Sequence, residues 1–299
     1  MLEEEALEKY RRAGKIAARV REEIKLKIKE GMPLLEICEK TERTIASLGG
    51  KPAFPCNVSV NEFAAHYTSP PEDGSVVPNR SLVKIDIGVH IDGYVADTAV
   101  TVCFDPELEE MVRASEAALE TATKIIRPGI HTSEVGSEVQ KTIERHGYRP
   151  ISNLTGHQVG RYIIHTGKSL PNVTHISLTK INAGDVFAIE PFTTLKDAAG
   201  RVEDGPGAFI FRLVKRKPVR DPEAARLVKF IEEEYRTLPF AERWLKSHYK
   251  GEEYEAAFKS LLASKTIMSY PVLVEASQKP VAQSEHTVYV DKNSAVVLT

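Results

Sequence analysis

The feature that most constrains the fold of this chain is an alternating stretch, KIDIGVHIDGYVADTAVTV, at positions 84–102. Asp92-Gly93 separates two runs rich in β-branched residues, and such a dipeptide is a strong signal for a two-residue hairpin turn. Pairing outward from this turn puts an apolar row on one face, formed in the first run by Ile85, Ile87, Val89 and Ile91. The stretch therefore predicts a β-hairpin that packs one face on a hydrophobic core.

The other face of this hairpin carries two acidic residues. In the same register Asp97 lies opposite Gly88 and Asp86 opposite Ala99, so the carboxylates are diagonal neighbours about 6–8 Å apart. Two close carboxylates repel, and either one takes up a proton or a cation neutralises the pair. The small residues opposite them leave room for a divalent metal, which is one interpretation of this face. A solvated face without function is the other, and a β-bulge would move one aspartate across the sheet.

Three further groups stand in unusual settings. Glu190 lies inside the apolar run VFAIEPF, Glu285 lies in QSEHTVYV, and His157 lies in NLTGHQV. A buried carboxylate must be protonated, paired or bound to a metal, although each group alone is more readily explained by ordinary structural contacts or partial exposure than by catalysis. Together with the two aspartates they form a set of four carboxylates and one imidazole, which favours a pair of divalent first-row metals.

Composition excludes several other classes of protein. The chain has 299 residues, 42% hydrophobic and 27% charged, which is enough to bury a core in one or two domains. The formal net charge is −2 without a basic tract, so no nucleic-acid partner is expected. The start MLEEEALEKYRR does not resemble a signal peptide, and no apolar run is long enough to cross a membrane. The three cysteines form no C-x-x-C pair, which disfavours a thiolate zinc site and favours a reducing, cytoplasmic location.

Apolar periodicity predicts a mixture of helices and strands. Helices are expected at 3–30, 35–48, 106–127 and 133–146, and strands at 51–61, 83–102, 186–192, 281–290 and 294–299. Near residue 220 this pattern changes. Asp221-Pro222 suits a helix start, with Asp as N-cap and Pro in the first turn. Further helical stretches are expected at 239–248 and 251–264, so we expect a main domain formed by 1–218 and 269–299 and an inserted helical subdomain at 219–268.

The ligand candidates, in the order Asp86, Asp97, His157, Glu190 and Glu285, resemble the metal-binding pattern of the methionine aminopeptidases. The surrounding stretches are similar too, namely KPAFPCNVSVNEFAAHYT, KIDIGVHIDGYVADTAVTV, TGHQVGRYIIH, GDVFAIEPF and QSEHTV. They extend from about residue 50 to residue 290, so the similarity covers most of the chain. The helical insertion resembles that of the type 2 branch, and the lack of a long polar N-terminal extension is similar to archaeal members.

This resemblance implies the pita-bread α/β (α+β) fold, in which two pseudo-symmetric αββ halves form a curved antiparallel sheet backed by helices. It also implies a dinuclear-metal aminopeptidase that removes the N-terminal initiator methionine from nascent proteins and favours a small second residue. The expected partners are methionyl peptides and nascent chains, at the ribosome or free of it. A monomer without nucleic-acid or membrane partners is expected.

The resemblance implies which side chains hold the metals. Asp97 and Glu285 would bridge two divalent ions. Asp86 would complete one site, and His157 and Glu190 would complete the other. Glu190 would in addition carry the proton of the attacking water. Co, Mn, Fe, Zn and Ni all accept such ligands, so the sequence leaves the identity of the ions open.

Two more histidines match catalytic positions of the family. His66, in AAHYT, resembles the histidine beside the scissile amide, and His165, in RYIIH, resembles the one that stabilises the tetrahedral intermediate. The pocket for the methionine side chain would include Phe54, Ile164 and Tyr270, because an apolar wall with aromatic contacts suits a thioether.

Two departures from the family pattern concern this pocket. Ser284 stands before the last glutamate, where family members usually carry a large residue, and is expected to loosen the packing of Glu285 or to widen the pocket. The stretch DGPGAFIF (204–211) lacks the histidine that eukaryotic type 2 members have there.

Two other classes share the fold that this resemblance implies. Xaa-Pro aminopeptidases and prolidases use the same ligand types but usually carry an extra N-terminal domain, whereas only residues 1–85 precede Asp86. Non-catalytic members that bind RNA, ribosomes or histones lose metal ligands, whereas all five are present here.

Overall fold

The computed structural model describes residues 2–214 and 219–299, so the expected domain boundary at 218 lies outside the described residues. The described helices are α1 (Glu4–Lys27), α2 (Leu34–Ser47), α3 (Glu109–Ile125), α4 (Thr132–Arg145), α5 (Pro222–Glu234), α6 (Glu242–Lys246) and α7 (Glu252–Ala263), with a 3-10 turn η1 at Pro106–Leu108. The helices predicted for the main domain are thus observed, and none of the described helices is long and apolar enough to span a membrane.

The strands form two larger sheets and three small ones. The first sheet contains β1 (Lys51–Pro52), β2 (Asn57–Val60), β4 (Leu82–Ile91) and β5 (Tyr94–Cys103). The second contains β7 (Thr155–Gln158), β8 (Ser169–Pro171), β9 (Val186–Ile189), β17 (His286–Val290) and β18 (Ala295–Val297). The small sheets contain β3 (Phe63–Ala65), β6 (Arg149–Pro150), β10 (Phe192–Thr194), β11 (Val202–Asp204), β12 (Ile210–Leu213), β13 (Phe240–Ala241), β14 (Ile267–Tyr270), β15 (Leu273–Glu275) and β16 (Val281–Gln283).

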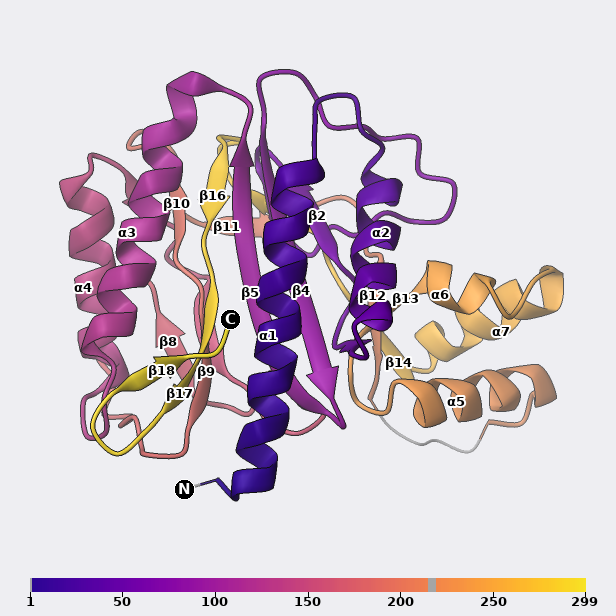
Figure 1. Ribbon diagram of the computed structural model, residues 1–299. Helices are drawn as coiled ribbons and strands as arrows, with labels where there is room; N and C mark the ends of the chain where they lie inside the picture. Colours follow the sequence, from indigo (N-terminus) through magenta and orange to yellow (C-terminus); the bar gives the residue numbers. More distant parts are fainter. Residues whose placement is uncertain (1, 215–218) are drawn as a thin grey trace.

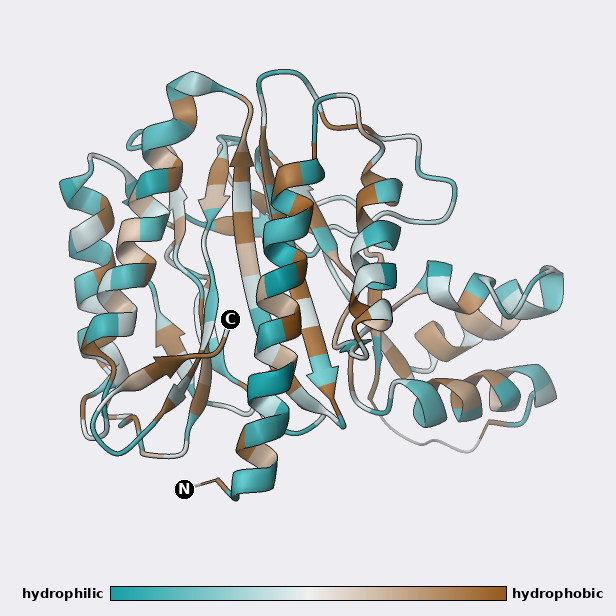
Figure 2. Ribbon diagram, in the orientation of Figure 1, coloured by the Kyte–Doolittle hydropathy of each residue, from teal (hydrophilic) through white to brown (hydrophobic). Residues whose placement is uncertain are grey.

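The hairpin predicted at 84–102 is β4 and β5, and its register is the predicted one, with Asp97 opposite Gly88. Asp92 and Gly93 form the turn with φ of 51° and 88°, the left-handed backbone that a type I′ turn requires. The apolar face of the hairpin joins α1 and α2 in one hydrophobic cluster. Figure 1 shows α1 lying along both strands, and Figure 2 shows the apolar residues of the strands beneath it.

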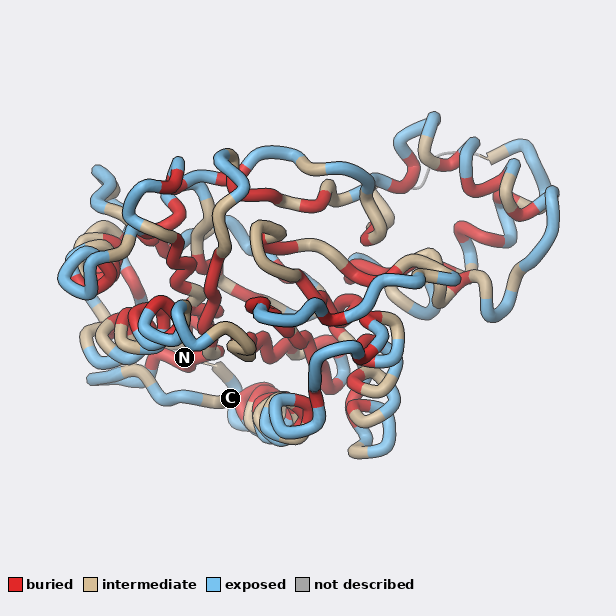
Figure 3. The backbone as a smooth tube through the Cα atoms, turned by 90° about the horizontal axis from the view of Figure 1, so that it is seen from above, coloured by how far each residue is buried: buried red, intermediate tan, exposed pale blue. Residues whose placement is uncertain are grey.

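The second half of the main domain repeats this arrangement. Helices α3 and α4 pack on each other and share a hydrophobic cluster with β8, β9 and β17. The second sheet has the order β18-β17-β9-β7-β8, and its pairs are antiparallel. Figure 3 shows that buried residues are concentrated in the strands and on the inward-facing sides of the helices, while the outward-facing sides of the helices are exposed.

The two halves meet where β5 runs beside the segment that leads into β17. The backbone N–H of Glu285 donates to the carbonyl oxygen of Ala99 at 3.1 Å, and Thr98 Oγ1 donates to the carbonyl oxygen of Glu285 at 2.8 Å. The backbone N–H of Asp97 donates to Thr287 Oγ1 at 2.7 Å. These bonds fix two acidic residues that are distant in sequence on adjacent strands.

The described part of the inserted segment contains α5, α6, α7, β13 and the start of β14, and extends to one side of the molecule (Figure 1). Its helices enclose a separate hydrophobic cluster, which includes Leu227, Ile231, Phe240, Tyr254 and Phe258. The helix expected at 239–248 is shorter than predicted, because Phe240 and Ala241 form strand β13 and pair with β12. By pairing with β12, the backbone N–H and C=O groups of these residues form strand hydrogen bonds in place of helical ones.

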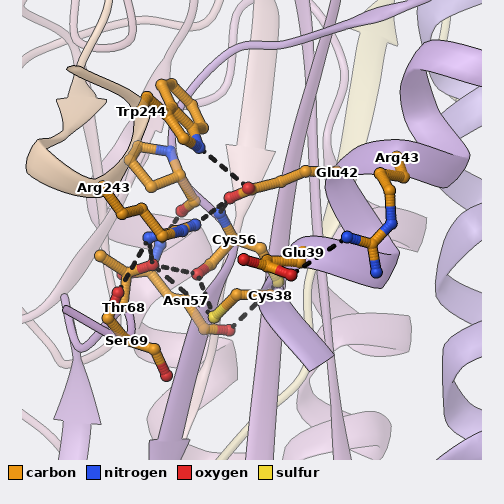
Figure 4. Close-up of polar contacts among 11 residues, drawn as sticks. Cys38, Glu39, Glu42, Arg43, Cys56, Asn57, Thr68, Ser69, Arg243 and Trp244 are labelled. Atoms are coloured by element: carbon orange, nitrogen blue, oxygen red, sulfur yellow. Dashed lines mark hydrogen bonds and ion pairs between the residues drawn. The ribbon is translucent and has the colours of Figure 1, made fainter. Parts of the chain in front are cut away.

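A buried ion pair holds α6 against α2 (Figure 4). Arg243 donates to one carboxylate oxygen of Glu42, and Trp244 Nε1 donates to the other at 2.9 Å. Arg243 also donates to Thr68 Oγ1 at 2.7 Å and to the carbonyl oxygen of Ser69 at 3.2 Å. The side chains of Arg243 and Glu42 are only 6% and 11% exposed, so water competes little for these bonds.

Candidate metal centre and substrate cavity

All ten residues singled out from the sequence line one cavity of about 230 Å³. The candidate metal ligands among them are Asp86, Asp97, His157, Glu190 and Glu285, and the candidate substrate contacts are Phe54, His66, Ile164, His165 and Tyr270. The fold therefore brings the two groups of residues to a single place.

Strand positions explain how the acidic groups reach this cavity. Asp86 and Asp97 lie within β4 and β5, and His157 lies on β7. Glu190 directly follows the last residue of β9, and Glu285 directly precedes the first residue of β17. Each glutamate thus lies at a break in a run that was predicted as one continuous strand. At such a break the side chain need not point to the face that regular strand alternation would give it.

The candidate ligands lie close enough to share a cation. Asp97, His157 and Glu285 each offer a ligand atom, and these atoms lie within 4.8 Å of one another. His157 Nε2 is 3.8 Å from Asp97 Oδ2 and 3.3 Å from Glu190 Oε1. Ligand atoms around one ion are typically about 3–4 Å apart, because each lies about 2 Å from the ion. Gln283 Nε2 donates to Glu285 Oε2 at 3.2 Å and helps to orient that carboxylate.

Burial makes these carboxylates hard to ionise without a cation. It raises the pKa of Asp86 to about 7. It also raises the pKa of Asp97 well above its usual range, and the charges of Asp86 and Glu190 add to the effect. The pKa values of Glu190 and Glu285 are likewise raised by burial first and by neighbouring carboxylates second. The site is therefore arranged for a positive charge that the protein itself does not supply.

Burial has the opposite effect on the three histidines, because it disfavours the imidazolium form. It lowers the pKa of His157 to about 3 and that of His66 to about 4. Burial and then the charge of Arg212 lower the pKa of His165. All three are neutral near pH 7, the form in which an imidazole can bind a metal or accept a hydrogen bond.

Unpartnered polar atoms at the cavity floor fit a divalent cation. Within the described residues, the buried oxygens Asn57 Oδ1, Asp86 Oδ1 and Asp97 Oδ1 have no hydrogen-bond partner. Leaving buried acceptors unsatisfied costs about 1–3 kcal/mol each. A cation bound by carboxylate oxygens and imidazole nitrogen would remove much of that cost, and this ligand set suits divalent first-row metals.

The space beside Gly88 is filled, although the small residues opposite the aspartates were expected to leave it open. A Cβ atom added to Gly88 would lie 2.3 Å from Cε1 of Phe54, so the phenyl ring occupies the space that was expected to stay open beside the aspartates. Glycine is required here because the ring approaches the strand backbone so closely. The apolar wall of the cavity and its acidic floor therefore meet directly at the hairpin.

His66 has a strained backbone at the edge of the cavity, with φ of 65°. Its Nδ1 lies 3.2 Å from the carbonyl oxygen of Pro271, and its ring meets the ring of Tyr270 edge-on at 5.6 Å. Non-glycine residues in this region of backbone space often occur at functional sites, where surrounding contacts hold the strain.

Several residues that line the cavity were not expected from the sequence, namely Asn57, Ala65, Asn153, Leu154, Thr155, Phe192, Ile210 and Pro239. Asn57 pairs with Asp86 across β2 and β4, so pairing the extended stretch at 51–61 with the hairpin would have found it. Ile210 belongs to the stretch without a histidine and pairs with Tyr270, so the wall there is apolar. Pro239 comes from the inserted segment, and no local signal points to it.

Ser284 is buried and turned away from the cavity. Its Oγ lies 2.7 Å from Oγ of Ser115 on α3, and it is 5% exposed. A pair of small hydroxyl residues thus fills the contact between α3 and this segment, so Ser284 does not widen the substrate pocket.

Comparison with known proteins identifies the family. Residues 8–217 match the family model for metallopeptidase family M24. A protein from Methanothermobacter thermautotrophicus named methionine aminopeptidase is 45% identical over 296 residues, which are 98% of each chain. A protein of the same name from Methanocaldococcus jannaschii is 44% identical over 298 residues, which are 100% of each chain.

Solved structures confirm the fold. A thermophilic Arx1 has a TM-score of 0.84 at 17% identity and covers 100% of this chain and 91% of its own. A methionine aminopeptidase from Thermotoga maritima has a TM-score of 0.72 at 23% identity, with 100% and 98% covered. A prolidase from Pyrococcus furiosus has a TM-score of 0.62 at 18% identity, with 99% of this chain but only 64% of the prolidase covered.

At these identities the structural likeness shows the fold alone, and the expected pita-bread arrangement is confirmed. The family rests on the relatives that match this chain over nearly its whole length at 44–45% identity. The chain therefore belongs to the methionine aminopeptidases of metallopeptidase family M24, enzymes that use a divalent metal to remove an N-terminal methionine.

Proposed function

We propose that this chain removes the initiator methionine of nascent proteins at a centre of two divalent ions, when the second residue is small. The observation that supports this best is the cavity itself. Four carboxylates and three imidazoles from both halves of the fold line one cavity together with a wall of apolar side chains. The acidic floor suits metals, and the apolar wall suits a methionine side chain.

The ligand set supports a centre of two ions. We infer that Asp97 and Glu285 would hold both ions, that Asp86 would complete one site, and that His157 and Glu190 would complete the other. Divalent ions held there would polarise the substrate carbonyl and lower the pKa of water. Carboxylates and imidazole do not choose strongly among Co, Mn, Fe, Zn and Ni.

The protein's own groups suit the proton transfers of peptide hydrolysis. Glu190, whose pKa is raised by burial, is suited to take the proton from the attacking water. Because His66 Nδ1 faces a carbonyl oxygen, this nitrogen carries the proton and Nε2 remains an acceptor for the scissile amide N–H. His165, whose ring lies 4.2 Å from that of His157, is suited to contact the substrate carbonyl oxygen.

The apolar wall accounts for the choice of the first residue. Phe54, Ile164 and Tyr270 line the cavity opposite the acidic floor. An unbranched thioether fills such a wall well, and sulfur–aromatic contacts add about 0.3–1.5 kcal/mol. The resemblance to the family is the basis for proposing a small second residue.

The test uses three peptides and several metals. Protein loaded with Mn, Co or Fe should cleave Met-Ala-Ser and leave Met-Lys-Ser and Ala-Pro-Ser intact. Elemental analysis of the loaded protein should find about two ions per chain. Cleavage of Ala-Pro-Ser alone would show that the chain has the specificity of the Xaa-Pro aminopeptidases and prolidases instead. Cleavage of none of the peptides with any metal would refute the proposal.

A further inference from the structure

A cation, Arg212, lies one row beyond the residues that line the cavity. On strand β12, Ile210 lines the cavity, and side chains two residues apart lie on the same face of a strand. On the paired strand β14, Tyr270 lies opposite Ile210 and Met268 lies opposite Arg212. Met268 is 43% exposed, so the Arg212–Met268 row is the outer, solvent-facing row of this wall.

The guanidinium of Arg212 lies beside the ring of Tyr270, and no carboxylate of the described residues pairs with it. Its Cζ lies 5.9 Å from the centre of the Tyr270 ring, and its charge contributes, after burial, to the lowered pKa of His165. Within the described residues, Arg212 forms no ion pair. The partly buried Arg21 and the buried Arg243, by contrast, are paired with Glu22 and Glu42. An unpaired arginine beside a substrate cavity is available to bind an anion.

We propose that Arg212 is a specificity residue that contacts the peptide downstream of the cleaved bond and favours an acidic side chain at its third or fourth residue. This inference rests on the proposed aminopeptidase function. It deepens that function by assigning a substrate preference that the metal centre and the methionine pocket do not explain.

The length of an extended chain sets the position of the contact. The distance along β12 from Ile210 to Arg212 is about 7 Å, because a strand rises about 3.3 Å per residue. An extended substrate covers the same distance in two residues, so a peptide that starts at the Ile210 row reaches Arg212 near its third or fourth residue. Neighbouring side chains alternate in direction, so one of these two faces the wall. A carboxylate there can accept two parallel hydrogen bonds from the guanidinium.

The test compares peptides that differ in one charge. Met-Ala-Glu-Ser-Gly-amide and Met-Ala-Ser-Glu-Gly-amide are compared with their lysine counterparts, and the amide removes the terminal carboxylate. One of the two acidic peptides should show a kcat/KM about two- to fivefold higher than its lysine counterpart, as for a partly exposed charge pair. The difference should appear in KM with kcat unchanged, since the contact lies away from the reacting atoms. It should shrink as NaCl screens the charges.

Variants of Arg212 test whether its side chain causes the preference for acidic peptides. Arg212→Gln should abolish it, Arg212→Lys should retain part of it, and Arg212→Glu should reverse it. The matched control is Arg226→Gln, because Arg226 stacks on Tyr249 at 5.8 Å within the inserted segment, and neither of those two residues lines the cavity. This control should keep the full preference.

The outcomes separate this inference from the function on which it rests. A wild-type protein that cleaves acidic and basic peptides equally well, or an Arg212→Gln variant that keeps the preference, would overturn the inference while the aminopeptidase activity stands. Failure to cleave any Met-Ala peptide would overturn the proposed function, and the inference would fall with it. Unfolding midpoints of the variants show whether a changed KM reflects a damaged fold.

Discussion

We propose that single residues at the cavity floor determine when this protein can bind metal. Burial raises the pKa of the four carboxylates, and burial lowers the pKa of the histidines. Near pH 7 the metal-free site therefore holds protons on acidic groups, and a metal must displace them. Metal affinity should rise with pH, because fewer protons then compete for the same oxygens.

The first prediction concerns Asp86 in the metal-free protein. Its folded-state pKa of about 7 lies above the ordinary value of 3.8. The charged carboxylate therefore destabilises the fold. This cost is absent below the ordinary pKa, grows as the pH rises and is complete above the folded-state pKa. In chelator, Asp86→Asn should be more stable than wild type by about 1–4 kcal/mol at pH 8 and equally stable at pH 4.

Urea unfolding at both pH values measures this difference. Because Asp92 belongs to the same hairpin but lies in its exposed turn, Asp92→Asn is the control and should show no such dependence on pH. Equal stability of Asp86→Asn and wild type at pH 8 would show that the carboxylate is not destabilised by burial.

The second prediction concerns Glu190. Glu190→Gln keeps the shape of the side chain but cannot take up a proton, so kcat for Met-Ala-Ser should fall by about 10²–10⁴. Circular dichroism and the unfolding midpoint should stay close to wild type. Glu120→Gln, on the exposed side of α3 where Glu120 pairs with Lys124, should have no effect. A Glu190→Gln variant with normal turnover would remove this residue from the mechanism.

At the scale of the secondary-structure elements, the inserted segment contributes to the wall of the substrate cavity. Strands β13 and β14, at its two ends, pair with β12, and it supplies Pro239 to the cavity wall, while Tyr270 follows just after it on β14. We propose that residues 219–268 form a subdomain, and that its docking on α2 through Glu42 sets the position of that wall. The ion pair with Arg243 is buried, so its geometry resists solvent.

The third prediction tests this docking. Arg243→Met leaves the buried Glu42 carboxylate with Trp244 as its remaining side-chain donor, and removal of one partner of a buried pair costs about 3–5 kcal/mol. The double variant Glu42→Gln/Arg243→Met should recover part of that loss. The control is Arg43→Met, because Arg43 and Glu39 form an exposed pair on the same helix (Figure 4), worth about 0.3–0.5 kcal/mol. Equal losses in Arg243→Met and Arg43→Met, measured by denaturant unfolding, would contradict this role.

At the scale of the whole molecule, the cavity joins the two halves of the fold. The aspartates come from the first half and His157, Glu190 and Glu285 from the second. A metal held by both groups would therefore link the halves, in addition to the backbone bonds between β5 and the segment before β17. Ligands that bind only the folded state stabilise it by mass action.

The fourth prediction follows from this link. Adding Mn or Co to the metal-free protein at about 100 times the dissociation constant should stabilise it by about 2.7 kcal/mol, and a chelator should reverse the gain. Asp97→Asn should lose most of this stabilisation, whereas Asp92→Asn should keep it. Equal stabilisation of both variants in thermal unfolding would show that Asp97 does not hold the metal.

Much of the fold and of the site follows from short-range sequence patterns. The turn at Asp92-Gly93 and strict alternation predict the hairpin register, which places Asp86 and Asp97 on one face. Helical periodicity predicts the four helices of the main domain. These features depend on local backbone preferences and on the burial of one face, so they can be derived without knowing the rest of the molecule.

Other features depend on contacts between distant segments. The sequence by itself determined the residue types at the floor, their order and the face on which the aspartates lie. Only the tertiary structure decided that the predicted strands break at Glu190 and Glu285, because those breaks depend on how the second sheet meets β5. It alone placed Phe54 over Gly88, turned Ser284 toward α3, and put Arg212 beside Tyr270 without an ion pair to any described residue. Local preferences are set by neighbours along the chain, whereas a shared cavity is set by packing between elements, which no single stretch of sequence contains.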